Sequence, residues 1–206
     1  MEDIRPDAIK IGMINDVEIV KVIASCLRKY QPRFVVFDPV MISTSGHRLI
    51  EEDAINALTQ ELMPLSSLIT PNLSEAEVLT GHRMDNVEKM EIAAPELLKY
   101  GCGAALLKGG HLEGGKMCDV LQIAGEEKPH LFVSDKIESK NTHGTGCTLS
   151  SAIATFLALG YDMPQAVEHA KAYVTGGIHA GKDIHIGEGH GPLNHFYAPV
   201  PMKIIR

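Results

Sequence analysis

Residues 34–38 read Phe34-Val35-Val36-Phe37-Asp38, a continuous apolar run that ends at an aspartate and is followed at once by Pro39. Apolar side chains on both faces of a strand are typical of a parallel sheet that helices cover on each side. Residues 16–30, just before this run, carry apolar side chains at helical spacing, and residues 8–13 form another short apolar run. Strand, helix and strand therefore follow one another, which predicts a βαβ unit.

The same alternation continues along the rest of the chain. We expect further strands at 67–70, 104–108, 118–124 and 130–135, and helices at 51–63, 74–81, 85–101, 147–159 and 165–180. Two of these helices begin at predicted capping boxes, Ser74 with Glu77 and Asp85 with Glu88, and glycines end them. The sequence predicts one α/β domain over residues 1–206, with a mostly parallel central sheet flanked by helices.

Composition excludes several classes of protein. The formal net charge is -7 and the basic residues form no tract, so nothing predicts nucleic-acid binding. No apolar run is long enough to span a membrane, and residues 1–6 lack the apolar region of a signal peptide. The cysteines show no CxxC spacing and the histidines no HxH or HExxH spacing, which predicts a cytoplasmic protein with reduced thiols and no zinc site. The cysteines are Cys26, Cys102, Cys118 and Cys147, and the histidines near glycines are His111, His143, His190 and His195.

Polar side chains stand where the predicted strands end. Asp38 ends one strand, Asn72 lies just after the next, and Lys108 ends a third. Ligands of open α/β sheets bind beyond the carboxyl ends of the strands. We therefore expect these three residues to belong to one site.

Residues 141–148 read Asn-Thr-His-Gly-Thr-Gly-Cys-Thr and give the strongest functional signal. Glycines let the backbone approach a ligand closely, and a helix that begins there points unpaired N–H groups at an anion. Such a turn suits a phosphoryl group in transit. A turn that only fits the helix against the sheet is an equally good reading of the glycines taken alone.

The whole chain resembles the hydroxymethylpyrimidine and phosphomethylpyrimidine kinases of the ribokinase-like family. Cysteine at position 147, where most ribokinase relatives have an aspartate, is typical of this branch. The same family order appears in the segments 10–13, 38–41, 70–77, 108–111 and 189–196, as well as in 141–151. The resemblance implies a ribokinase-like fold, and ATP-dependent phosphorylation of 4-amino-5-hydroxymethyl-2-methylpyrimidine and its monophosphate for thiamine synthesis.

The resemblance also implies residue roles. Gly144, Thr145 and Gly146 would form the anion hole, and Cys147, whose position at a helix start lowers a thiol's pKa, would face the substrate hydroxyl. The other implied roles concern ATP, Mg²⁺ and the pyrimidine. Asn72, Glu75, Lys108 and Thr142 would bind the nucleotide, Asp38 and Glu75 would organise the metal, and Met13, Val40 and Cys147 would contact the pyrimidine.

Each of these roles has a plainer alternative. The alternative for Cys147 is a small buried residue, and Cys26, Cys102 and Cys118 are read only in that way. Asn72 and Glu75 are also favoured at an ordinary helix N-terminus. Asp38 could instead hold the following loop in place, and Lys108 could be a strand-end lysine whose ammonium group reaches water. For the whole protein, the alternatives are a pyridoxal or pyridoxine kinase and a non-catalytic ligand-binding relative. A dinucleotide-binding dehydrogenase is weak, because no G-x-G-x-x-G follows an early strand.

The chain departs from the family at its start. Family members begin with a strand and a glycine-rich segment that carries part of the pyrimidine pocket, and no such segment precedes Met1. We therefore expect an N-terminally truncated member without its first strands, with an unpaired sheet edge and exposed apolar surface. Poor solubility or inactivity of these residues alone would follow. The family resemblance suggests a homodimer.

Overall fold

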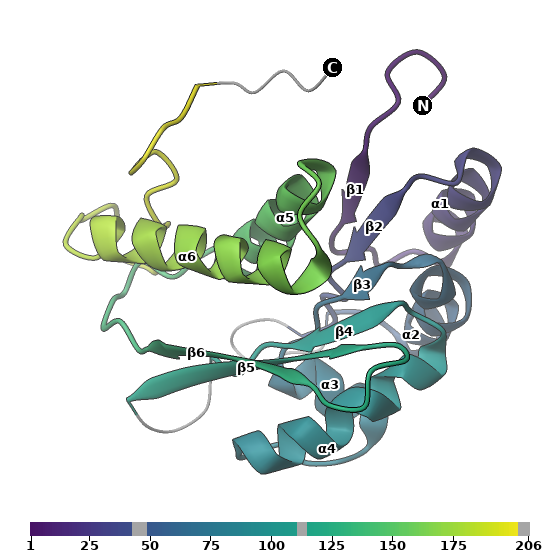
Figure 1. The fold of residues 1–206 in the computed structure, drawn as a ribbon, viewed down its shortest axis with the longest axis horizontal. Helices are drawn as coiled ribbons and strands as arrows, with labels where there is room; N and C mark the ends of the chain where they lie inside the picture. Colours follow the sequence, from purple (N-terminus) through teal and green to yellow (C-terminus); the bar gives the residue numbers. More distant parts are fainter. Residues whose placement is uncertain (43–48, 111–114, 202–206) are drawn as a thin grey trace. The chain divides into compact units, whose positions relative to one another are not determined.

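The computed structural model describes residues 1–42, 49–110 and 115–201 and divides the chain into two compact units, Met1–Asp135 and Lys136–Arg206. Figure 1 shows the elements of both units. The first unit carries the sheet and most of the helices. The second consists of two helices and the segments that flank them.

The sheet of the first unit runs β1-β2-β3-β4-β5-β6 in chain order, within the described ranges. The first four strands are parallel to one another, and β5 and β6 form an antiparallel hairpin after them. The prediction of a mostly parallel α/β sheet is confirmed. The strands are β1 Ala8–Ile11, β2 Phe34–Phe37, β3 Leu68–Ile69, β4 Ala104–Leu107, β5 Lys116–Ile123 and β6 His130–Asp135.

Helices connect the parallel strands, as the βαβ pattern requires. The predicted helix over 51–63 changes its winding: α2 Glu52–Ala57 continues into a π-helix, η1 Leu58–Leu62, and then into a 3₁₀ turn, η2 Met63–Leu65, which contains Pro64. A proline has no N–H to donate, which suits a short terminal turn rather than a helix interior. The remaining helical elements of this unit are α1 Val17–Tyr30, α3 Leu73–Thr80, α4 Val87–Leu97 and η3 Leu98–Tyr100.

The core follows from the alternation of side chains along each strand. Val35 and Phe37 of β2 join one hydrophobic cluster with residues of the connecting helices, whereas Val36 points to the opposite face by strand alternation. All three are buried, so β2 is covered on both faces as its sequence predicts. The same holds for β4, in which all four residues are buried.

Two predicted capping boxes are wrong in register. Helix α3 begins earlier than expected, because Asn72 is its N-cap and forms the box with Glu75. Both Asn72/Glu75 and Ser74/Glu77 fit the sequence pattern of a box, but Ser74 is exposed, and Glu77 instead accepts a bond from the Met84 N–H. The second box is replaced by a single cap at Asn86, which accepts from the Lys89 N–H, and Asp85 pairs with the Lys89 ammonium. Gly81 and Gly101 end their helices in the left-handed conformation, as predicted.

The second unit contains α5 Thr145–Ala158 and α6 Met163–Gly181, which pack against each other. Helix α5 begins two residues before the predicted start. One stripe of α5 is buried, whereas Ser151 and Thr155 are exposed. Helix α6 begins at a capping box of Asp162 with Gln165.

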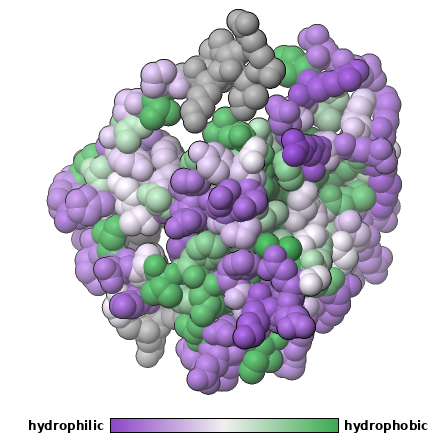
Figure 2. Space-filling model, viewed as in Figure 1, coloured by the Kyte–Doolittle hydropathy of each residue, from purple (hydrophilic) through white to green (hydrophobic). Residues whose placement is uncertain are grey.

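The surface view agrees with the charge pattern of the sequence. Figure 2 shows hydrophilic side chains over much of this face, with apolar side chains dispersed between them. Among the described residues, no helix is long and apolar enough to cross a membrane.

One close approach in the first unit gives a stability prediction. A Cβ on the buried Gly109, just after β4, would overlap the carbonyl oxygen of Cys118. Gly109→Ala therefore has to displace backbone, and we expect it to lower the free energy of unfolding by about 1–3 kcal/mol. Urea denaturation measures the loss. Gly115→Ala, whose Cβ meets nothing within 4 Å, is the control, and equal effects of the two substitutions would contradict the prediction.

Candidate active site

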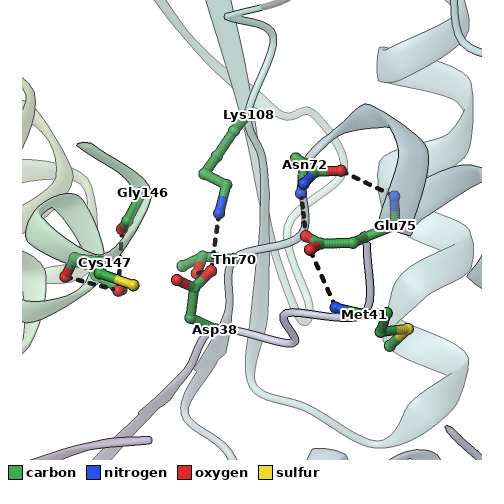
Figure 3. Close-up of polar contacts among 9 residues, drawn as sticks. Asp38, Met41, Thr70, Asn72, Glu75, Lys108, Gly146 and Cys147 are labelled. Carbon is green, nitrogen blue, oxygen red and sulfur yellow. Dashed lines mark hydrogen bonds and ion pairs between the residues drawn. The ribbon is translucent and has the colours of Figure 1, made fainter. Parts of the chain in front are cut away.

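A cluster of polar side chains forms where three neighbouring parallel strands end. Asp38 follows β2, Thr70 follows β3 and Lys108 follows β4, and Figure 3 shows Thr70 and Lys108 both directed at the carboxylate of Asp38. The Thr70 hydroxyl and the Lys108 ammonium each donate to Asp38 Oδ1 at 2.8 Å. The backbone adds to this alignment, because the Lys108 N–H donates to the Pro71 carbonyl at 3.0 Å. The structure thus brings two of the predicted site residues, Asp38 and Lys108, into direct contact.

The contact between Asp38 and Lys108 is a buried ion pair. The Asp38 side chain is 1% exposed and that of Lys108 16% exposed. A buried charge needs a partner, and removing one member of such a pair leaves the other uncompensated. The lysine therefore directs its charged head at a carboxylate, and the reading of Lys108 as a lysine whose head reaches water is wrong.

Glu75 lies beside this cluster and is held by backbone amides. Its Oε2 accepts from the Asn72 N–H at 2.8 Å and its Oε1 from the Met41 N–H at 3.3 Å (Figure 3), while Asn72 Oδ1 accepts from the Glu75 N–H. These bonds cap α3 and fix the chain that leaves β2. The role of Asn72 and Glu75 as a helix start is thus real, whatever else they do.

Burial raises the pKa of Glu75 above its ordinary value, because desolvation penalises the charged form. The positive charge of Lys108 and the two backbone bonds oppose the rise, and the negative charge of Asp38 adds to it. The three ionisable groups therefore influence one another electrostatically. A further cation near Glu75 would favour its ionised form.

The cluster could bind a magnesium ion only if water and phosphate oxygens supply most of its ligands. The described residues contain no group of three or more histidine, cysteine or acidic side chains that could hold a metal by themselves. Mg²⁺ accepts one or two carboxylates and keeps several waters and phosphate oxygens as its other ligands. Asp38 and Glu75 fit this sparse arrangement, and they do not fit an all-protein cage.

In the second unit, α5 starts at a turn that leaves backbone donors open. Gly144 is the N-cap with φ 82°, a left-handed conformation that favours glycine, and no side chain caps the helix. In the part of the chain that the structure describes, the N–H groups of Gly146 and Cys147 have no hydrogen-bond acceptor. By contrast, α1, α3, α4 and α6 all have side-chain caps. An uncapped helix start with free amides is suited to an anion.

The side chains around this turn differ in exposure. Cys147 is exposed in the first turn of α5, so its reading as a small buried residue is wrong. Thr142 is also exposed, and its carbonyl accepts from the N–H and the hydroxyl of Thr145. The carbonyls of Gly146 and Cys147 accept from the Ser150 hydroxyl, which holds the turn from within the helix.

The other cysteines and the predicted pocket residues are placed as follows. All four cysteines are free thiols. Cys102 and Cys118 are buried as expected, whereas Cys26 is exposed on α1, contrary to the prediction. Met13 is 55% exposed after β1, and Val40 is half-buried after β2. His111 lies outside the described residues.

Three features, two in the first unit and one in the second, were missed in the sequence. Thr70 adds a hydroxyl to Asp38, the Met41 N–H adds a donor to Glu75, and His195 lies within hydrogen-bond distance of Thr148 in α5. Thr70 had a signal, because it ends a predicted strand as Asp38 and Lys108 do. The other two depend on contacts between residues 34 and 47 positions apart, for which no local pattern exists.

Comparison with known proteins identifies the family of the chain. The family model for phosphomethylpyrimidine kinase matches residues 1–194. A hydroxymethylpyrimidine/phosphomethylpyrimidine kinase of Rhizobium meliloti is 43% identical, over 95% of this chain and 73% of the relative. The thiamine biosynthesis bifunctional protein ThiED of Geobacter sulfurreducens is 45% identical over 95% of this chain, which spans 39% of that longer protein.

Solved structures show the same fold. A phosphomethylpyrimidine kinase from Clostridium difficile is 44% identical with a TM-score of 0.72, covering 84% of this chain and 70% of that one. The pyridoxal kinase of Staphylococcus aureus in complex with AMP-PCP and pyridoxal is 30% identical with a TM-score of 0.82, covering 92% and 67%. The fold is therefore ribokinase-like, as predicted, and the chain belongs to the phosphomethylpyrimidine kinase family.

Proposed function

We propose that this protein transfers the γ-phosphoryl group of ATP to 4-amino-5-hydroxymethyl-2-methylpyrimidine and then to its monophosphate, in thiamine synthesis. The observation that carries the proposal is the uncapped start of α5, where two free amides stand beside an exposed thiol. The names of the relatives support the substrate. The two compact units serve as parts of one kinase domain in this proposal.

In the reaction, the substrate hydroxyl oxygen forms a bond to the γ-phosphorus while the bond from that phosphorus to the β-bridging oxygen breaks, releasing ADP. The hydroxyl loses its proton in the same process. Negative charge on the transferred group's equatorial oxygens is stabilised by preorganised N–H donors, which are the free amides of Gly146 and Cys147 in the turn that Gly144 opens. Cys147 accepts the proton or orients the hydroxyl, and the loose transition state requires little from a base.

The charged cluster of the first unit serves the phosphates in this proposal. Lys108 neutralises phosphate charge. Asp38 and Glu75 would hold Mg²⁺, which would supply positive charge to neutralise the phosphates. Asn72 orients Glu75 by the capping box. Thr142 lies beside the nucleotide, and Met13, Val40 and Cys147 contact the pyrimidine.

A pyridoxal kinase is the second candidate, because solved pyridoxal kinases share the fold at 30% identity. The pyrimidine kinases are favoured, because the relatives named for that activity are 43% and 44% identical. A non-catalytic relative that only binds ligand is the third alternative, and turnover separates it from both kinases.

A coupled ADP-release assay on the full-length gene product tests the proposal. We expect ATP-dependent turnover with the hydroxymethylpyrimidine and with its phosphate, at a kcat/KM at least about tenfold above that for pyridoxal. Turnover with pyridoxal alone would reassign the substrate. Ligand binding without any turnover would support the non-catalytic alternative instead.

The two exposed cysteines provide a matched pair for testing the thiol. Cys147→Ala removes the group beside the open amides, and we expect kcat to fall about 100-fold, the lower range for loss of a general base. Cys26→Ala on α1 should keep parental kinetics, because it is also exposed but lies outside the proposed site. Circular dichroism melting curves verify that both variants fold. A kcat for Cys147→Ala within twofold of the parent would rule out a role in proton transfer.

Glu75 gives a prediction about pH. Because its pKa is raised in the folded state, the folded protein binds the proton more tightly than the unfolded chain, and this stabilisation is lost as the pH rises through the folded pKa. At low pH, we expect Glu75→Gln to lower the free energy of unfolding by about 1–3 kcal/mol relative to the parent. The reason is that a side-chain amide cannot accept from both backbone N–H groups. The difference in free energy of unfolding between the variant and the parent should become smaller as the pH rises through the pKa of Glu75 in the folded protein.

Urea unfolding at each pH measures this narrowing. Glu127→Gln in the exposed turn between β5 and β6 controls for the loss of one negative charge. A deficit that stays constant over the whole range would show that the Glu75 carboxyl does not carry the raised pKa.

A further inference from the structure

The segment of residues 189–196, Gly-His-Gly-Pro-Leu-Asn-His-Phe, matches the family and has no role in the proposed reaction. In the second unit this segment returns to the chain that leads into α5. The His143 N–H donates to the Gly191 carbonyl at 3.0 Å. A Cβ on Gly191 would overlap Asn141 Oδ1, so only glycine fits here without displacement.

Asn141 is itself held in place. It is 6% exposed, and its Nδ2 donates to the carbonyls of Gly181 and Ile184, each at 2.6 Å. These bonds tie the residues just before the Gly144 turn to the end of α6. The entrance to the turn is therefore fixed by residues at least 40 positions further along the chain.

Two glycines of α6 allow the segment 189–196 to pack closely against that helix. The Asn194 N–H donates to the Gly177 carbonyl at 2.9 Å, and Cβ atoms on Gly177 and Gly181 would lie 2.9 Å from Leu193 Cδ1 and from the Asn194 nitrogen. The Tyr173 hydroxyl donates to the His195 carbonyl, also at 2.9 Å. The backbone of His195 is thus held in place by α6.

The His195 ring meets the first turn of α5. Its Nε2 lies 3.0 Å from Thr148 Oγ1. The Thr148 hydroxyl has one proton, and it donates this proton to the Gly144 carbonyl at 2.8 Å. The hydroxyl must therefore accept from the ring, which requires that Nε2 carries a hydrogen.

We propose that His195 is a positioning residue for the anion-binding turn. Its Nε2–H holds the Thr148 hydroxyl on the Gly144 carbonyl, which also accepts the Thr148 N–H at 2.9 Å as the first helical bond of α5. The turn so fixed presents the free amides of Gly146 and Cys147. The benefit to phosphoryl transfer rests on the proposed function, whereas the coupling of His195 to the turn stands on the hydrogen bonds alone.

Amide hydrogen exchange followed by NMR tests the coupling without turnover. In His195→Ala, the Thr148 amide should exchange about fivefold faster, which is the loss expected from one hydrogen bond. The Ile153 amide in the middle of α5 should keep the parental rate. His195→Gln, whose side-chain amide can donate in place of Nε2, should restore protection, and His179→Ala on the exposed end of α6 is the control.

A double-mutant comparison identifies the path of the effect. In a Thr148→Val background, His195→Ala should not further accelerate hydrogen exchange of the backbone amide at position 148, because the hydroxyl that accepts from His195 is already absent. Long-range ¹H–¹⁵N correlation should show the proton of His195 on Nε2 in the parent. Unchanged Thr148 exchange in His195→Ala, an equal acceleration in the Thr148→Val background, or a proton on Nδ1 alone would each overturn the coupling.

Kinetics on the full-length product then test the catalytic consequence. His195→Ala should lower kcat about fivefold and leave the KM for the pyrimidine unchanged, with His195→Gln restoring kcat. Parental kcat in a variant with accelerated exchange would overturn the catalytic part of the inference. A parent without any turnover refutes the proposed function, and the exchange data then decide the positioning role by themselves.

Discussion

A carboxylate that is shielded from water needs compensation, and in the first unit this requirement organises the ends of three strands. Asp38 ends β2, and its compensation comes from Lys108 at the end of β4 and Thr70 at the end of β3. These contacts are possible only in one register of the parallel strands, because a shift by one residue would turn the side chains to the other face. The charge pair and the sheet register therefore specify each other.

Glu75 extends this arrangement to the helices. The same carboxyl that caps α3 also binds the backbone after β2, so the strand end and the helix start cannot move independently. Its burial is costly in the charged form, and the nearby lysine offsets part of this cost. A carboxyl group in this state responds readily to an added cation.

At the α5 turn, by contrast, polar backbone groups are left without partners among the described residues. Other long helices of the chain satisfy their first amides with their own side chains, while α5 begins with a bare glycine. The free energy forgone at this end is of the order of 1 kcal/mol per missing cap. Natural proteins tolerate such local deficits where a ligand supplies the missing acceptor.

Much of the fold was predictable because its signals are local. The apolar run at 34–38 predicted a strand covered on both faces, and glycines at 81 and 101 predicted helix ends. The first capping box was misplaced because the overlapping registers of Asn72/Glu75 and Ser74/Glu77 satisfy one pattern, whereas the second gave way to a single cap at Asn86. The winding change after α2 has no sequence signature of this kind. Within the site, Asp38 and Lys108 were predicted from their positions at strand ends. Their ion pair and the partner of Thr148 were not, since both depend on distant segments meeting in space.

The separation along the chain between Thr148 and His195 also bears on biogenesis. A loop of 47 residues must close before this bond exists, and closure of long loops is a slow part of folding. During synthesis the α5 turn emerges well before its distant partners, so it first exists without the hydrogen bonds that they supply. The nascent chain thus acquires the final geometry of this turn only after residue 195 has been made.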